Sequence, residues 1–176
     1  MDSYFLSHLD DLVTLHPITP EVAIAIVLTI ALLILSGFAS GSEIAFFSLS
    51  PADLNELKPD KNTSDEGICR LRDDSERTLA TILITNNLVN VTIIMLCNFI
   101  FGSLVEFKAK WLDFLVITVF LTFLLLLFGE IMPKVYSRSA PLKFCRRAVG
   151  GILLLRKLFW PLETVLIKSG VIAEKA

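Results

Sequence analysis

Residues 22–35 read VAIAIVLTIALLIL, and Thr29 is the one polar side chain among them. We expect the helix that contains this stretch to cover about residues 21–47. Because a helix rises about 1.5 Å per residue, a helix of this length can cross the roughly 30 Å of hydrocarbon in a bilayer. The stretch therefore predicts a membrane-spanning helix near the start of the chain.

The rest of the chain agrees with a membrane protein. Of its 176 residues 54% are hydrophobic, and the mean hydropathy is +0.69. Two further stretches, residues 79–101 and 111–131, are also long and apolar enough to span a bilayer. The sequence thus predicts three spans.

A fourth apolar region, residues 152–172, has a different pattern because charged residues interrupt it. At helical spacing Arg156 and Lys157 lie on one side, whereas Leu158 and Leu162 lie on the other. This pattern favours a helix that lies in the membrane interface, with a fourth span as the alternative. We therefore predict an all-α membrane protein with three transmembrane helices plus juxtamembrane amphipathic helices on the cytosolic side.

Basic residues are unevenly distributed among the predicted loops. Residues 1–20 contain no Lys or Arg. The loop after the first span and the segment after the third span contain Lys58, Lys61, Arg70, Arg72, Arg77, Lys134, Arg138, Lys143, Arg146 and Arg147. Because Lys and Arg accumulate on the cytosolic side, we predict that the N-terminus lies outside and the C-terminus in the cytosol. The expected location is the plasma membrane, the inner membrane of a bacterium.

The expected organisation has three parts. Residues 1–20 are an extracytoplasmic segment, residues 21–147 the three-span domain and residues 148–176 the amphipathic helix. A cytosolic loop at about residues 48–78 is expected to be helical in two pieces. The Ser-Pro-Ala-Asp run near its start is typical of a helix N-terminus.

Each predicted span carries a small polar cluster. The clusters read SGFASGSE at residues 36–43, TNNLVN at residues 85–90 and FGEIMPK at residues 128–134. With the orientation above, all three lie in the inner half of the membrane. Polar side chains in hydrocarbon are costly unless they meet one another, water or an ion. Oxygen donors from three helices at one depth therefore predict a site for a small, hard cation.

Helical spacing organises the first two clusters. The pairs that are four residues apart, and so share a helix face, are Ser36 with Ser40, Gly37 with Gly41, and Asn86 with Asn90. The serines and asparagines offer oxygen ligands, and the glycines allow helices to pack closely. The alternative for both clusters is structural: small residues that permit packing, and asparagines that hydrogen-bond one helix to another.

The third cluster places Glu130 three residues before Pro133. Proline has no N–H to donate to the carbonyl of Gly129, so we expect a kink that leaves a backbone oxygen next to a carboxylate. Two such oxygens would suit a cation. The alternative is a span that ends with a boundary Glu and a helix-stopping Pro.

At these residues the chain resembles a known family. The runs SGSE at residues 40–43, NNLVN at residues 86–90 and FGEIMPK at residues 128–134 look like the three signatures of the transmembrane domain of CorC and cyclin M (CNNM) magnesium transporters. The resemblance extends over about residues 20–170. One departure is Thr85, where the family usually has Gly.

The resemblance implies a homodimer with three spans per subunit, juxtamembrane helices and a dehydrated Mg²⁺ bound between the helices. It also implies that cytosolic CBS domains, removed from this chain, follow the transmembrane domain. The predicted metal ligands are Ser36, Ser40, Asn86, Asn90 and Glu130, with Ser42, Glu43, Thr85, Asn87 and Gly129 as additional candidates.

Ligand chemistry favours Mg²⁺ over softer metals. Mg²⁺ takes about six hard oxygens, and hydroxyl, carboxamide, carboxylate and backbone oxygens are of that type. Copper and zinc would be expected to use soft ligands that these clusters lack. Na⁺ accepts the same oxygens, so exchange of Mg²⁺ for Na⁺ stays open. Because the clusters lie nearer the cytosol, the predicted function is Mg²⁺ export across the lipid bilayer.

A second function class stays open, a regulatory or assembly module of the membrane whose polar clusters hold a dimer together. Enzymatic and nucleic-acid-binding functions are not expected. Both histidines precede the first span, the three cysteines lack metal-binding spacing, and the sequence has no phosphate-binding glycine loop.

Overall fold

The computed structural model describes residues 13–59, 62–107 and 110–174, and three of its helical segments are long and apolar enough to cross a membrane. The first is α2, Pro20–Phe47, and the second is α5, Ser75–Leu104. The third consists of α6, Lys110–Leu124, the π-helical segment η1, Leu125–Ile131, and α7, Met132–Ser139. The predicted fold class, a helical membrane domain with three spans, is confirmed.

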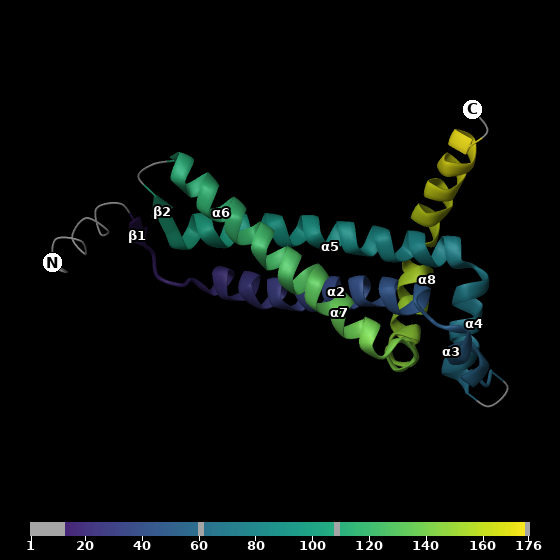
Figure 1. Ribbon diagram of the computed structural model, residues 1–176. Helices are drawn as coiled ribbons and strands as arrows, with labels where there is room; N and C mark the ends of the chain where they lie inside the picture. Colours follow the sequence, from purple (N-terminus) through teal and green to yellow (C-terminus); the bar gives the residue numbers. More distant parts are fainter. Residues whose placement is uncertain (1–12, 60–61, 108–109, 175–176) are drawn as a thin grey trace.

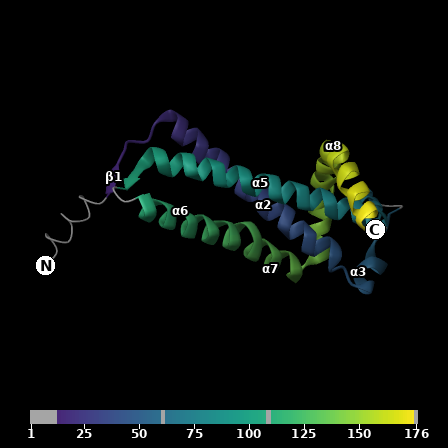
Figure 2. The same cartoon turned by 90° about the horizontal axis from the view of Figure 1, so that it is seen from above.

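The helices α2 and α5 run side by side, and the third span crosses this pair diagonally (Figures 1 and 2). At one end α6 packs on α5, where the rings of Phe101 and Phe120 meet edge to face with 5.1 Å between centroids. At the other end η1 and α7 pack on α2. Buried Val89, Ile93 and Cys97 of α5 join the three spans in one apolar core. The diagonal path brings the polar clusters of all three spans together.

A pair of short strands, which the sequence did not predict, closes one end of the bundle. β1, Val13–Leu15, pairs antiparallel with β2, Val105–Phe107, and Thr14 lies opposite Glu106. The amide of His16 donates to the carbonyl of Leu104 at 2.9 Å. Three-residue strands are too short to show an alternation of apolar and polar residues, and the two strands are far apart in the sequence. Residue pattern alone therefore does not predict this pairing.

The opposite end holds three further helices (Figure 1). These are α3, Pro51–Glu56, α4, Thr63–Asp73, and α8, Pro141–Glu174. A capping box starts α3, in which the Ser50 hydroxyl accepts from the amide of Asp53 at 3.2 Å and the Asp53 carboxylate accepts from the amide of Ser50 at 2.9 Å. Buried apolar residues of α4, Ile68 and Leu71, pack against Ile152 of α8. The predicted helical loop is therefore two helices.

The long helix α8 runs across the ends of α2 and α5 rather than alongside them (Figure 1). It begins at Pro141, earlier than the predicted residue 148, and it continues through Pro161. Leu154, Leu158 and Leu162 form an exposed apolar row on it, four residues apart. This transverse path fits an interfacial helix, and no fourth span is found among the described residues.

One charged residue of α8 has a position that the sequence did not predict. Glu163 is completely buried, and its Oε1 accepts a hydrogen bond from the hydroxyl of Thr81 on α5. Its other oxygen, Oε2, is buried without a hydrogen-bond partner among the described residues. In the sequence, Glu163 is one of the charged residues that interrupt the apolar region 152–172, and that pattern does not predict a partner on α5.

Candidate cation site

Side-chain oxygens of α2 and α5 converge at the middle of the three-helix contact. The Ser36 hydroxyl oxygen lies 2.7 Å from Oδ1 of Asn90 and 3.0 Å from Oδ1 of Asn86. The hydroxyl of Ser40, one turn further along α2, lies 3.4 Å from the same Asn86 oxygen. Both serines are completely buried. We call these four residues the Ser–Asn cluster.

The hydroxyl protons of the Ser–Asn cluster leave oxygen lone pairs unused. Ser36 has a single proton, so while it donates to Asn90, Asn86 can accept only from Ser40, at 3.4 Å, and each carboxamide oxygen keeps a second lone pair. Lone pairs of several neutral oxygens therefore face one small volume. A cation placed there would satisfy the acceptors that the hydroxyl protons do not.

Two glycines of α2 let the third span approach the cluster. A Cβ atom on Gly37 would lie 2.9 Å from Cγ of Pro133, and one on Gly41 would lie 2.8 Å from Cζ of Phe144. Contacts under about 3 Å are too short for a real Cβ atom, so a side chain at Gly37 or Gly41 would require Pro133 or the Phe144 ring to shift. Both glycines pack within the subunit, on α7 and α8.

The π-helical segment η1 brings backbone to the cluster. A Cβ atom on Gly129 would lie 3.1 Å from the Ser36 hydroxyl oxygen, so η1 contacts the cluster directly. The amide of Met132 donates to the carbonyl of Leu127, five residues earlier. Single π turns inside α-helices occur frequently at functional sites.

This π register changes which backbone oxygen Pro133 leaves without a donor. The α-helical spacing assumed in the sequence analysis pointed to the carbonyl of Gly129. Continuing the i→i+5 register by one residue instead places the missing amide opposite the carbonyl of Phe128. That oxygen lies 3.3 Å from the position of a Cβ atom on Gly37, beside the cluster. Phe128 therefore joins Gly129 as a candidate backbone ligand.

Glu130 follows Gly129 directly and is half-buried. Within the described part of the chain its carboxylate forms neither an ion pair nor a side-chain hydrogen bond. Lys134, four residues later, lies 3.2 Å from Glu43 of α2 and thereby pairs with a different carboxylate. Glu130 thus directly follows the residue that contacts the cluster, and its carboxylate has no basic partner in the described part of the chain.

The structure does not bring the remaining candidates into the cluster. Ser42 and Thr85 donate their hydroxyl protons to carbonyls of their own helices, those of Phe38 at 2.7 Å and Thr81 at 2.8 Å. Asn87 is exposed on the outer face of α5. Glu43 is occupied by its pair with Lys134. The convergent set is therefore smaller than the sequence analysis allowed.

The composition of the site limits its chemistry. Within the described residues, no three His, Cys, Asp or Glu side chains come close enough to hold a metal together. The oxygens that converge are neutral hydroxyl and carboxamide groups of Ser36, Ser40, Asn86 and Asn90. This arrangement suits a hard cation held by few charges, as expected of an ion that must be released again.

Comparison with known proteins agrees with this architecture. Residues 27–175 match the family described as the cyclin M transmembrane N-terminal domain. The chain belongs to this family. The match covers most of α2 and all of α5, the third span and α8, and it confirms the resemblance that the three signatures indicated.

Two curated relatives carry family names without a stated function. A UPF0053 protein of Haemophilus influenzae is 31% identical over 136 residues, which are 77% of this chain and 31% of that protein. A UPF0053 protein of Synechocystis sp. is 27% identical over 129 residues, 72% of this chain and 36% of that protein. The chain spans about a third of the length of these relatives.

Proposed function

We propose that this cyclin M domain transports magnesium across the membrane and binds Mg²⁺ between α2, α5 and η1. The ligands are oxygens of Ser36, Ser40, Asn86, Asn90 and Glu130, with the backbone oxygen of Phe128 as an additional ligand. The family to which the chain belongs is linked to magnesium transport. In this role Mg²⁺ is the transported substrate.

The observation that carries the proposal is the convergence of the Asn86 and Asn90 oxygens on Ser36, which also contacts η1 one residue before the unpaired Glu130. An ionised carboxylate near the middle of a bundle is costly without a counter-charge. The nearest basic residue on its own helix, Lys134, is engaged by Glu43. A divalent cation would supply the counter-charge and accept the surplus lone pairs.

The proposed direction rests on the depth of the site, and the proposed coupling rests on its ligands. The clusters lie between the middle of the bundle and its α3–α4 end, which we assign to the cytosol because its loops carry most of the basic residues. A site close to that side loads from the cytosol, so we propose Mg²⁺ export. Na⁺ accepts the same neutral oxygens, and its entry is the candidate driving reaction.

The orientation can be tested with single cysteines in a variant that lacks the three native ones. Thr14 and Asn55 are exposed at opposite ends of the bundle. In the proposed inner-membrane orientation, Thr14→Cys reacts with an impermeant maleimide on intact cells. Asn55→Cys should react after the membrane is opened. The reverse pattern would place the site near the outer surface and contradict export.

We also propose a homodimer that uses α5 and the third span. Asn87, Val91, Ile94 and Asn98 lie on one face of α5, spaced at three to four residues, and all are exposed. A carboxamide facing lipid is unfavourable, whereas in a dimer it can hydrogen-bond to the partner. Cross-linking of Val91→Cys in lipid should trap a dimer. A purely monomeric product would contradict this interface.

The decisive experiment for the ion site is isothermal titration of Mg²⁺ into the purified chain and its Glu130→Gln variant. The variant keeps the shape of the side chain and removes the charge, so it should fold and lose measurable Mg²⁺ affinity. Glu106→Gln makes the same change on exposed β2 and should bind as the parent does. Equal affinity in parent and Glu130→Gln would refute the site.

The second candidate function is an assembly module without transport. It is favoured by the hydrogen bonds of Ser36 and Ser40, which already join α2 to α5 in the absence of an ion. Ligands that bind the folded state raise its stability, so Mg²⁺ should raise the unfolding temperature of a transporter domain. Unfolding temperature and protease sensitivity that do not respond to Mg²⁺ would favour the module.

A further inference from the structure

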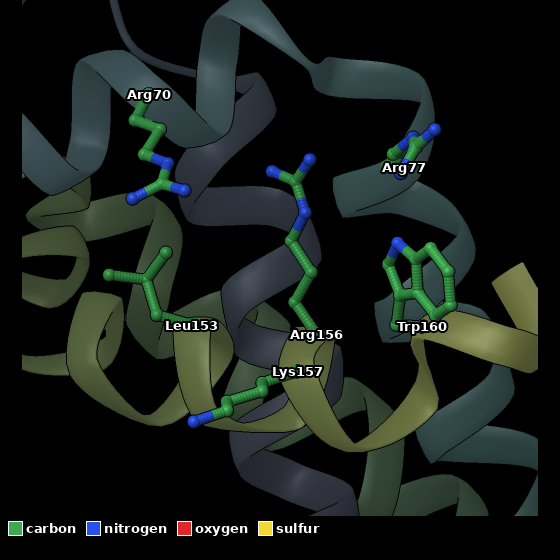
Figure 3. A pocket seen from close by; sticks show the side chains of 6 residues that line it. All are labelled: Arg70, Arg77, Leu153, Arg156, Lys157 and Trp160. Atoms are coloured by element: carbon green, nitrogen blue, oxygen red, sulfur yellow. The ribbon is translucent and has the colours of Figure 1, made fainter.

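A second site lies away from the Ser–Asn cluster, where α4, α5 and α8 meet. An open cavity of about 610 Å³ is formed there by Arg70, Arg77, Leu153, Arg156, Lys157 and Trp160. Figure 3 shows Arg70 of α4 and Arg156 of α8 extending from facing helices toward the same space, with Trp160 and Arg77 beside it. Four of the six lining side chains are cationic.

These cations are poorly neutralised. Among the described residues, their ion pairs involve a single carboxylate, that of Asp74, which pairs with Nη2 of Arg156 and lies 3.7 Å from Nε of Arg77. Arg70 and Lys157 are exposed and form no ion pair within the described part of the chain. The cavity therefore carries a net positive charge.

Arg156 gives a separate indication that a ligand belongs here. Its Nη1 is buried and has no hydrogen-bond partner among the described residues. Guanidinium donors are fixed in a planar fork, and a buried donor without an acceptor is unfavourable. An anion with several oxygens would satisfy Nη1 and be shared with the other cations around the cavity.

The surroundings of the cavity indicate where the anion comes from. Trp160 is 59% exposed, and tryptophan accumulates at the level of lipid headgroups. The adjoining exposed row of α8 contains Leu158 and Leu162, which would face acyl chains if α8 lies in the interface. Basic pockets between helices on the cytosolic side of membrane proteins bind anionic headgroups.

We propose that this cavity binds the phosphate group of an anionic phospholipid in the inner leaflet. The phosphate lies between Arg70 and Arg156, Lys157 adds long-range attraction, and the acyl chains follow the leucine row of α8. A soluble phosphate has the same chemistry at the cationic end and lacks the acyl chains. This site is independent of the magnesium site and of its proposed function.

Trp160 provides a local probe. The chain contains two tryptophans, so Trp111→Phe leaves Trp160 as the sole fluorophore. In phosphatidylcholine vesicles, brominated phosphatidylglycerol should quench Trp160 with a relative association constant about tenfold above that of brominated phosphatidylcholine. The additional double substitution Arg70→Gln/Lys157→Gln should reduce this ratio to about one. Both replaced side chains are exposed, so the fold should remain intact.

A matched control removes the same charges elsewhere. Arg138→Gln/Lys143→Gln changes two exposed basic residues outside the cavity and should keep the phosphatidylglycerol preference. Equal quenching by the two brominated lipids in the parent would overturn the proposal. An equal loss of the phosphatidylglycerol preference in both double variants would also overturn it. If Trp160 fluorescence responds saturably to inorganic phosphate and shows no lipid preference, the cavity binds a soluble phosphate, and the proposed lipid ligand is wrong.

Discussion

Two polar regions of this molecule differ in how their charges and hydrogen bonds are paired. At the α3–α4 end, Nε and Nη2 of Arg146 donate to the two carboxylate oxygens of Asp65 at 2.7 and 3.1 Å, and Nη1 donates to Glu56 at 3.0 Å. In the span, Ser36 and its asparagine partners contain no formal charge, and the nearby Glu130 has no basic partner among the described residues.

The difference lies in what each region can still bind. In the Arg146 network, formed by Arg146, Asp65 and Glu56, hydrogen bonds from Arg146 hold the pKa of Asp65 below its usual range, and the two carboxylates raise the pKa of Arg146. The charges and hydrogen-bonding groups of these three residues pair with one another, so the network fixes α4 to α8. The Ser–Asn cluster keeps surplus acceptors and therefore has capacity for a cation.

The largest effect is expected where the spans touch most closely. Gly37→Leu places a side chain into Pro133, and the Phe128 carbonyl is too close for it to turn away. Overpacking of this kind costs about 3 kcal/mol or more, so the variant should lose its folded monodisperse peak in detergent. Gly102→Leu, which meets no atom within 4 Å, is the control and should behave as the parent does. Equal behaviour of the two variants would show that the spans do not pack as described.

A smaller loss is expected in the Arg146 network. Asp65 is 1% exposed, so Asp65→Asn leaves the half-buried Arg146 with Glu56 alone and should cost about 2 kcal/mol of unfolding free energy. The exposed neighbour Glu66 is the control, and Glu66→Gln should change stability by less than about 0.5 kcal/mol. Thermal unfolding in detergent measures both. A loss as large in Glu66→Gln would mean that the pair has no special role.

The same pair predicts a pH dependence. The folded-state pKa of Asp65 is lowered, chiefly by its hydrogen bonds from Arg146. Its stabilising contribution is therefore complete above the ordinary Asp pKa of about 3.9 and is lost as the pH falls through the lower, folded-state value. Asp65→Asn should remove this part of the acid sensitivity. If Asp65→Asn loses stability at low pH as the parent does, other groups cause the acid sensitivity.

In the Ser–Asn cluster the expected change is in ion binding. Ser36→Ala removes the hydroxyl on which Asn86 and Asn90 converge and should weaken Mg²⁺ binding about tenfold, measured by titration. Ser42→Ala removes an equally buried hydroxyl that bonds to the carbonyl of Phe38 in its own helix. It should leave Mg²⁺ affinity unchanged. If both variants bind as tightly as the parent, the cluster is structural.

Composition was sufficient to predict the spans, because length and apolarity alone decide whether a helix can cross a bilayer. Four-residue spacing also placed Ser36 with Ser40, and Asn86 with Asn90, on one face of each helix. The structure brings these two faces together through three serine–asparagine contacts. These features depend on one helix alone, or on two helices whose polar faces must contact each other because lipid offers no hydrogen-bond partner.

Other features depend on neighbours that a sequence pattern does not specify. The π register of η1 is not visible in the residue pattern, so α-helical counting selected Gly129 and missed Phe128 as a second candidate. Asn87 matches the family signature as well as Asn86 does, yet it is exposed. The pairing of Glu43 with Lys134 depends on how α7 crosses α2, which no local spacing determines.

The smallest effect is expected at the contact between backbone and cluster. A methyl group on Gly129 would lie 3.1 Å from the Ser36 hydroxyl oxygen, a contact that the serine can relieve by shifting a few tenths of an ångström. Gly129→Ala should therefore fold and weaken Mg²⁺ binding only about threefold, or roughly 0.7 kcal/mol. Gly150→Ala, with open space around it in α8, should not alter binding. If Gly129→Ala binds Mg²⁺ as the parent does, η1 does not help to shape the ion site. The site then consists of the hydroxyls and carboxamides of α2 and α5 alone.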